Sequence, residues 1–211
     1  MTPTDRYNTS GLPEDQFEPG SDGTVLKNLL GITSREEMEI AETEALWQTE
    51  ERLFDEVAQD QQFTAQDFCD MHRLWLGRIY PWAGKYRQVN ISKGGFTFAM
   101  AHTIPAMMEH FECEQLRRYT PCQFPSRNAV AEALAEVHTE LMLIHPFREG
   151  NGRFGRLIAT LMALQAGLPP LDFRELAGKR REEYFAAVRA GLDCDYRPMT
   201  RLFAAVIERS S

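Results

Sequence analysis

The most informative stretch of this chain is HPFREGNGRFGR, residues 145–156. It contains one imidazole (His145), one carboxylate (Glu149) and two guanidiniums (Arg153 and Arg156). A carboxylate can hold a divalent cation, and arginines bind phosphoryl oxygens in bidentate fashion. The histidine is then left for proton transfer. These residue types predict a site that handles phosphate groups.

Two predicted helices flank this stretch. Apolar residues recur at spacings of three and four through residues 126–144, and another apolar series follows the glycines. Arg153 and Arg156 are three residues apart on the second helix, so both can face one anion. Unpaired N–H groups and the helix dipole attract phosphate at a helix N-terminus. The amides expected at that position belong to Gly150, Asn151 and Gly152.

Residues 145–156 resemble the active-site signature of the Fic family, His-Pro-Phe-x-Asp/Glu-Gly-Asn-Gly-Arg-x-x-Arg, and every specified position is filled. So many fixed positions make the match far more specific than a lone glycine-rich loop. The resemblance implies an all-α fold, a multi-helix bundle with one β-hairpin flap. It also implies a protein adenylyltransferase, which transfers the AMP of ATP to a hydroxyl side chain of a target protein.

The resemblance assigns a role to each motif residue. His145 is the expected catalytic base that deprotonates the target hydroxyl, and Glu149 is the expected Mg²⁺ ligand on the ATP phosphates. The residues expected to bind those phosphates are Gly150, Asn151, Gly152, Arg153 and Arg156. Apart from the resemblance, a hydroxyl that attacks phosphorus needs a base near pH 7, and histidine has an unperturbed pKa of about 6.5.

A second segment, residues 80–100, predicts a β-hairpin. Two β-prone runs, 86–91 and 96–98, lie on either side of a Gly-Gly turn. In Fic proteins a hairpin flap covers the active site and pairs with the target segment in strand fashion, and the lead-in WAGKYR at residues 82–87 is similar to the one before that flap. An ordinary surface hairpin remains the alternative. The residues expected to contact target and nucleotide are Lys93, Gly94, Gly95 and Phe96.

Further helices are expected over residues 34–58, from residue 64, and over residues 104–119, 180–192 and 197–208. The first of these is expected to have a dense acidic outer face. Tyr184 matches a tyrosine common in this part of Fic domains, which leaves two roles for it: lining the nucleoside pocket or packing in the core. His138 lies on the same helical face as His145 and is expected to be a packed histidine or a support for the site.

The composition limits the partners. The chain has 211 residues, of which 43% are hydrophobic, which predicts one globular domain with a well-buried core. Residues 1–23 are rich in Pro, Gly, Asp, Ser and Thr and are expected to form an irregular arm. The resemblance implies a Fic domain over residues 24–211. No apolar run approaches the length of a membrane span, and no secretory leader is visible. A net charge of −8 argues against direct nucleic-acid binding. Four cysteines without metal-ligand spacing favour a cytoplasmic protein.

Regulation is a further expectation from the resemblance. Many Fic enzymes carry an inhibitory helix with the pattern Ser/Thr-x-x-x-Glu-Gly/Asn, whose glutamate pairs with the second motif arginine, here Arg156. Residues 10–15 and 33–38 come near this pattern without matching it. The resemblance therefore implies the class that is inhibited by a separate small antitoxin protein, which supplies the glutamate on a helix.

The same class implies a stand-alone toxin, rather than a translocated effector, that acts on type II topoisomerase subunits. Three alternatives remain. Doc toxins are kinases of the same fold with a lysine where this chain has Gly152, so glycine favours AMP transfer. A different nucleotidyl transfer could use the same scaffold. A protein that only docks phosphorylated partners would need neither His145 nor Glu149.

Overall fold

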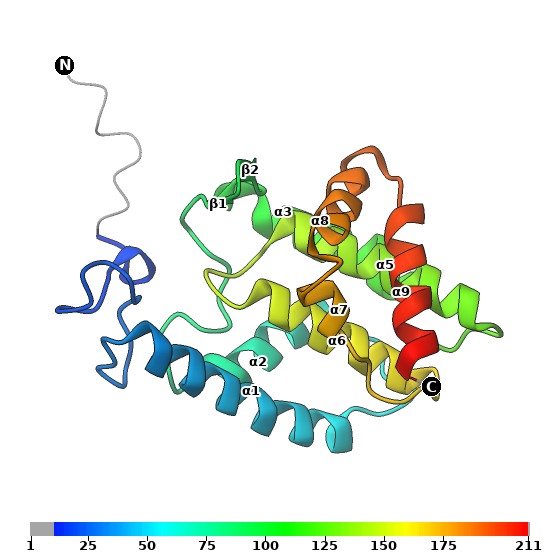
Figure 1. The fold of residues 1–211 in the computed structure, drawn as a ribbon, viewed down its shortest axis with the longest axis horizontal. Coiled ribbons are helices and arrows are strands. Elements are labelled where there is room, and N and C mark those ends of the chain that lie inside the picture. The colour runs from blue at the N-terminus through cyan, green and yellow to red at the C-terminus, as the bar shows by residue number, and fades with distance from the viewer. Residues whose placement is uncertain (1–10, 211) are drawn as a thin grey trace.

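The computed structural model describes residues 11–210, apart from the side chain of Ala177. Within that range the chain is helical except for turns, loops, an isolated bridge and one two-stranded sheet (Figure 1). The helices are α1 (Arg35–Glu56), α2 (Ala65–Leu76), α3 (Ile104–Phe111), α4 (Arg117–Tyr119), α5 (Arg127–Ile144), α6 (Asn151–Gln165), α7 (Arg174–Ala177), α8 (Arg181–Ala190) and α9 (Arg197–Ser210). Shorter turns are η2 (Pro13–Asp15), η3 (Ala101–Thr103), η4 (Glu112–Leu116) and η5 (Gly191–Asp193). The expected all-α fold with one hairpin is confirmed.

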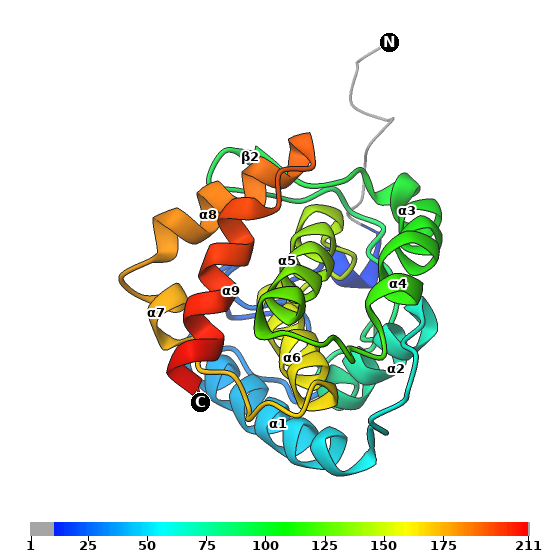
Figure 2. The same ribbon diagram turned by 90° about the vertical axis from the view of Figure 1, so that its right-hand side faces the viewer.

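Helices α5 and α6 form the centre of the molecule, and the other helices surround them (Figure 2). Both are buried on most faces, because apolar and small residues occupy nearly every turn. Ser126 caps α5 by accepting a hydrogen bond from the amide of Ala129. Gly155 lets the two helices approach closely, since a Cβ there would lie 2.6 Å from Cε of Met142. The predicted helices on either side of the motif are confirmed.

Helices α1 and α2 pack together along one side of this centre (Figure 1). Ser34 caps α1, and Thr64 and Asp67 form a reciprocal capping box at the start of α2. One acidic residue of α1, Glu42, is not on the outer face and is only 4% exposed. It lies on the same helical face as buried Met38 and Thr49.

The hairpin consists of β1 (Ser92–Lys93) and β2 (Phe96–Thr97), paired antiparallel. Gly94 and Gly95 both have positive φ, as a two-residue hairpin turn requires. The predicted hairpin is confirmed, but the strand expected over residues 86–91 is wrong. There the amide of Arg87 donates to the carbonyl of Pro146, so this segment is bound to the motif loop instead.

The remaining helices follow the predictions with local differences. The helix expected over residues 104–119 is present as α3 and α4 joined by a π-helical turn, η4. The two C-terminal helices are confirmed as α8 and α9, whereas the single turn α7 was not predicted. No helix within residues 11–210 combines the length and apolar character needed to cross a lipid bilayer.

The N-terminal segment packs against the motif loop. Glu14, in η2, is 6% exposed and accepts the amide of Gln88, while its carbonyl accepts Nε–H of Arg148. An isolated bridge joins Phe17 to Leu26. Residues 1–10 of the predicted arm lie outside the described residues, and the domain boundary at residue 23 stays a prediction.

Candidate active site

The motif loop between α5 and α6 begins and ends in left-handed backbone. His145 ends α5 with φ of 53°, and Gly150 precedes α6 with φ of 81°. A side chain at Gly150 would strike the indole of Trp75, which lies 2.6 Å from the ideal Cβ position. The glycine is therefore required both by its φ and by the close approach of α2.

The His145 ring is oriented for proton transfer. Its Nδ1 lies 3.2 Å from the carbonyl of Met142, so Nδ1 carries the hydrogen and donates it. Its Nε2 has no hydrogen-bond partner within residues 11–210 and is available as an acceptor. Phe98, just after the hairpin, stacks on the ring at 3.7 Å. Burial lowers the pKa of His145 to about 4, so the imidazole is neutral at physiological pH.

Burial of Asn151 gives it a different role from the one expected. Its side chain is 4% exposed, accepts the amide of Phe147 and donates to the carbonyl of Phe147. Both polar groups are therefore occupied inside the protein, and the side chain braces the loop. Phe147 is fully buried, so the loop is fixed from within.

A cavity of about 600 Å³ lies beside His145. Its walls come from the hairpin, the end of α5, the first turns of α6, and α7 and α8. Of the predicted site residues, it brings together Lys93, Gly94, Phe96, His145, Gly152, Arg153, Arg156 and Tyr184. Four others, Gly95, Glu149, Gly150 and Asn151, do not line it. Two of those four, Glu149 and Gly150, belong to the motif loop, and Glu149 forms an ion pair with Arg153.

Glu149 is the carboxylate of the motif loop, and it lies beside Arg153. Its side chain is 44% exposed, it accepts the amide of Gly150, and it lies 3.6 Å from Nη2 of Arg153. No cluster of three or more metal-ligating side chains exists among the described residues. A single carboxylate suits Mg²⁺, which is commonly held by one or two carboxylates, water and substrate phosphates.

The two motif arginines differ in their surroundings. Arg153 forms an ion pair with Glu42 at 2.5 Å and lies over the ring of Trp75. Arg156 makes no ion pair within 4 Å to any described residue, and it interacts electrostatically with Tyr184 and Glu50 at longer range. Burial is the main reason that the pKa of Arg156 is lowered. An unpaired, partly desolvated guanidinium is a strong site for an anion.

Tyr184 borders the cavity and also packs against the core. Its hydroxyl lies 2.9 Å from Nε2 of His138. Nδ1 of His138 lies 3.1 Å from the carbonyl of Gly155, so Nδ1 donates there and Nε2 accepts the tyrosine hydroxyl. His138 is 2% exposed and is a packed histidine that ties α5 to α6 and α8.

Three supporting residues were missed from the sequence. His72 of α2 is fully buried, stacks on Phe147 at 3.8 Å and has Nε2 3.2 Å from the carbonyl of Glu149. Arg87 is 1% exposed and donates to four backbone carbonyls, including that of His145. Phe98 stacks on His145. No local signal marks such residues, apart from the presence of a charged or aromatic group within an otherwise apolar segment.

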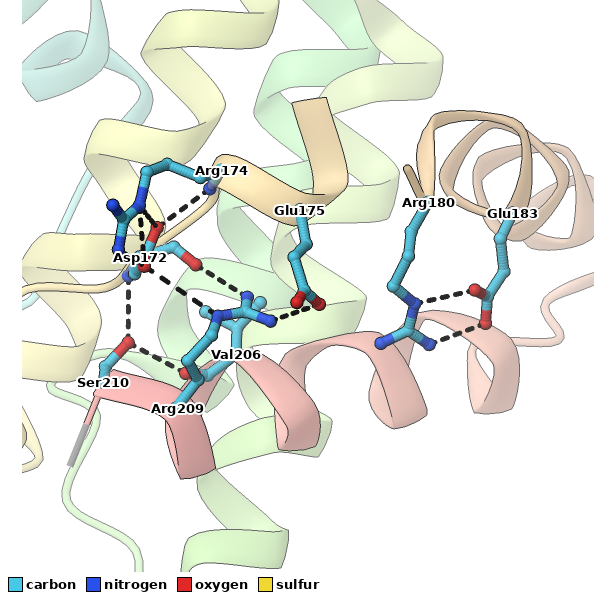
Figure 3. A network of polar contacts seen from close by, with 8 residues as sticks. All are labelled: Asp172, Arg174, Glu175, Arg180, Glu183, Val206, Arg209 and Ser210. Atoms are coloured by element: carbon cyan, nitrogen blue, oxygen red, sulfur yellow. Dashed lines mark hydrogen bonds and ion pairs between the residues drawn. The ribbon is translucent and has the colours of Figure 1, made fainter. Parts of the chain in front are cut away.

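The wall formed by α7 and α8 is held by surface ion pairs (Figure 3). Arg209 of α9 pairs with Glu175, and Arg180 pairs with Glu183 at 2.8 Å. Asp172 accepts from Arg174 just before α7. These pairs are largely exposed, so each contributes little stability.

Residues 62–163 match the family model described as Fic/DOC family. The match covers just under half of the chain, which therefore contains a segment of the Fic/DOC type. The matched segment contains α2, the hairpin, α5 and most of α6, and therefore His145, Glu149 and both motif arginines. The residues of α1 and α8 that face the site lie outside it.

Curated relatives carry the name protein adenylyltransferase Fic. The one from Aedes aegypti is 29% identical over 148 residues, which cover 70% of this chain and 28% of the relative. The one from Drosophila ananassae is 23% identical over 205 residues, covering 97% of this chain and 40% of the relative. The chain thus spans less than half the length of these relatives.

Solved Fic structures share the fold. The BepC protein of Bartonella tribocorum, with bound AMPPNP, has a TM-score of 0.75 at 21% identity, covering 93% of this chain and 97% of that one. A Bep Fic domain from Bartonella quintana, with bound ADP, has a TM-score of 0.73 at 24% identity, covering 91% and 94%. Both similarities extend over the whole Fic domain, beyond the segment matched by the family model.

Proposed function

We propose that this Fic domain transfers AMP from ATP to a hydroxyl side chain of a target protein. One observation carries the proposal: the neutral His145 ring, with Nε2 unpartnered, borders the same cavity as Arg153 and Arg156 at the start of α6. The adenylyltransferase names of the relatives and the adenine nucleotides in two solved neighbours support it.

The chain's own residues account for each step. Nε2 of His145 accepts the proton of the target hydroxyl as its oxygen attacks the α-phosphorus. The bond from the α-phosphorus to the bridging oxygen breaks, and pyrophosphate leaves. Amides at the N-terminus of α6, with Arg153 and Arg156, stabilise the phosphate charge. Glu149 would hold Mg²⁺, which supplies charge neutralisation on the phosphates.

Gly152 favours AMP transfer over phosphoryl transfer. A Cβ at this position would meet only the end of Arg156, 3.8 Å away, so packing does not demand a glycine. The missing side chain at Gly152 therefore affects the ligand in the cavity rather than the packing of the protein. A Doc-like lysine would place a cation against the phosphates at this point, and its absence leaves the α-phosphate near His145.

The decisive experiment uses ATP labelled separately at the α- and γ-phosphates, with Mg²⁺ and a bacterial lysate. We expect label transfer to protein from the α-position only, and His145→Ala should reduce it by about 10²–10⁴-fold. Nucleotide binding by His145→Ala, measured by calorimetry, should stay within a few-fold of wild type. Transfer from the γ-position would establish the Doc-like kinase instead, and unchanged transfer by His145→Ala would exclude this mechanism.

The hairpin is proposed to hold the target segment. Ser92, Lys93 and Thr97 are exposed, and the two-residue strands leave backbone groups free for pairing. Lys93, Gly94 and Phe96 also line the cavity, so a bound segment would be held beside His145. Backbone pairing would fix the position of the target segment along the hairpin, but it would discriminate little between target sequences.

The proposed biological role is that of a cytoplasmic toxin paired with a small antitoxin, with type II topoisomerase subunits as targets. Unpaired Arg156 supports this, because a glutamate supplied in trans could occupy it. A translocated effector is the second candidate, favoured by the two Bartonella neighbours, which are VirB-translocated effector proteins. Co-expression decides: a neighbouring small protein should suppress growth arrest, and Arg156→Ala should abolish that arrest.

A further inference from the structure

Arg153 lies between two carboxylates that come from different parts of the chain. Its Nη2 is 2.5 Å from Oε2 of Glu42 on α1 and 3.6 Å from Oε1 of Glu149 on the motif loop. The side chain of Glu42 is 6% exposed, whereas that of Glu149 is 44% exposed. The guanidinium thus makes its short contact with the buried carboxylate and a longer ion pair with the more exposed one.

Glu42 is itself held in place. Its Oε1 accepts the hydroxyl of Tyr80 at 2.6 Å, and its backbone carbonyl accepts Nε1–H of Trp75 at 2.9 Å. The Trp75 ring also lies under the guanidinium of Arg153, whose Cζ is 5.0 Å from the ring centroid. Since α1, α2 and the turn after α2 supply all of these contacts, the position of Arg153 is set by residues outside the motif.

Glu149 would be the natural partner of Arg153 if Glu42 were absent. Glu149 lies two residues before α6 and already forms an ion pair with Arg153 at 3.6 Å, so a small shift of the guanidinium would bring the two to hydrogen-bonding distance. A guanidinium bonded to that carboxylate would compete with a metal ion for the same oxygens. An uncompensated positive charge would also repel the cation.

We propose that Glu42 is a positioning residue: it tethers and neutralises Arg153 so that the Glu149 carboxylate stays open to a divalent cation. This rests on the proposed function only in the role that it gives to Glu149. The tether itself concerns Glu42, Arg153 and Glu149 and can be measured without any reaction.

The first test measures metal binding. The complex with AMPPNP is titrated with Mn²⁺, and free Mn²⁺ is followed by electron paramagnetic resonance. Glu42→Gln should raise the dissociation constant about tenfold, the low end of the range for residues that orient metal ligands. Tyr80→Phe, which loosens Glu42 but keeps its charge, should raise it less. Glu39→Gln, the same change at an exposed position of α1, is the matched control and should leave it unchanged.

The second test uses no metal and no nucleotide. If Arg153 moves to Glu149 when Glu42 loses its charge, then Glu149→Gln should destabilise the Glu42→Gln protein more than it destabilises the wild type. Urea unfolding of the wild type, the two single variants and the double variant gives this coupling. Additive effects, or equal Mn²⁺ affinity in Glu42→Gln and Glu39→Gln, would overturn the tether. Failure of the α-label experiment would remove the proposed function but leave this coupling intact.

Discussion

The motif loop (residues 145–150) and the hairpin (residues 92–97) border the same cavity and are held in opposite ways. The loop is held by the buried side chains of Arg87 and His72, which are distant in sequence, and by that of Asn151, which follows it directly. The hairpin pairs only with itself, through four strand residues, and most of its side chains are exposed. The motif loop, which is proposed to position the phosphates, is held by several independent contacts. The hairpin, which is proposed to bind the target, is left free to adapt.

Of the substitutions, removing the Arg87 side chain is expected to have the largest effect on stability, because this side chain holds the motif loop. Arg87→Met leaves the carbonyls of His145, Val89 and Ala99 without their donor inside the protein. We expect a loss of about 3–5 kcal/mol in the free energy of unfolding, measured with urea. Arg87→Lys keeps the charge and should cost less. A loss below about 1 kcal/mol for Arg87→Met would mean that the loop does not depend on this side chain.

A pair of glycine substitutions compares the two regions directly. Gly150→Ala meets both a positive φ and the indole of Trp75, and should cost about 2–4 kcal/mol. Gly94→Ala meets a positive φ of 57° but no atom within 4 Å, and should cost about 1–2 kcal/mol. Thermal unfolding of both variants gives the difference. Equal losses would contradict the contrast between a packed loop and an open hairpin.

The hairpin and the loop meet where Phe98 stacks on His145. Phe98→Ala exposes the imidazole to water, and since burial is the main cause of its lowered pKa, that pKa should rise from about 4 toward its ordinary value of 6.5. The change is measured by NMR titration of the ring protons. Phe96→Ala, which removes a neighbouring ring that does not stack on His145, should shift it less. If the pKa of His145 were unchanged in Phe98→Ala, residues other than Phe98 would be responsible for burying the imidazole.

Acidification should destabilise the motif loop at a higher pH than the hairpin. Near neutral pH the effect on stability is small. Burial lowers the pKa of His72, His138 and His145 to about 4. The unfolded chain therefore binds more protons between about pH 6.5 and pH 4, and stability falls as pH decreases through that window. The three shifts together imply a loss of about 5 kcal/mol at pH 5. We therefore expect the Tm to drop by about 10 °C or more from pH 7 to pH 5. Amide exchange at the two pH values should show the increase in opening at residues 145–150 and little change at residues 92–97.

Much of the fold could be read from local signals. Ser34, Thr64 and Ser126 begin α1, α2 and α5 as their cap positions predicted. The Gly-Gly turn of the hairpin was equally clear. These predictions succeeded because a cap or a tight turn depends on a few neighbouring residues.

Predictions that needed long-range partners were weaker. The run at residues 86–91 has β-prone residues, yet Arg87 donates to carbonyls of the motif loop, and no strand forms there. Glu42 reads as one acid among many on α1, and only the packing of α1 against α2 buries it beside Tyr80. Asn151 reads as an anion ligand, but its amide is used within the loop.

The sequence by itself determined the chemistry that the site can hold: a histidine at a helix end, a carboxylate, and arginines at the start of the next helix, all within residues 145–156. That information is local because the groups are neighbours in the chain. The tertiary structure alone decided which arginine is paired. Glu42, far away in sequence, reaches Arg153 and leaves Arg156 unpaired among the described residues, because burial and ion pairing depend on how helices pack rather than on the order of residues.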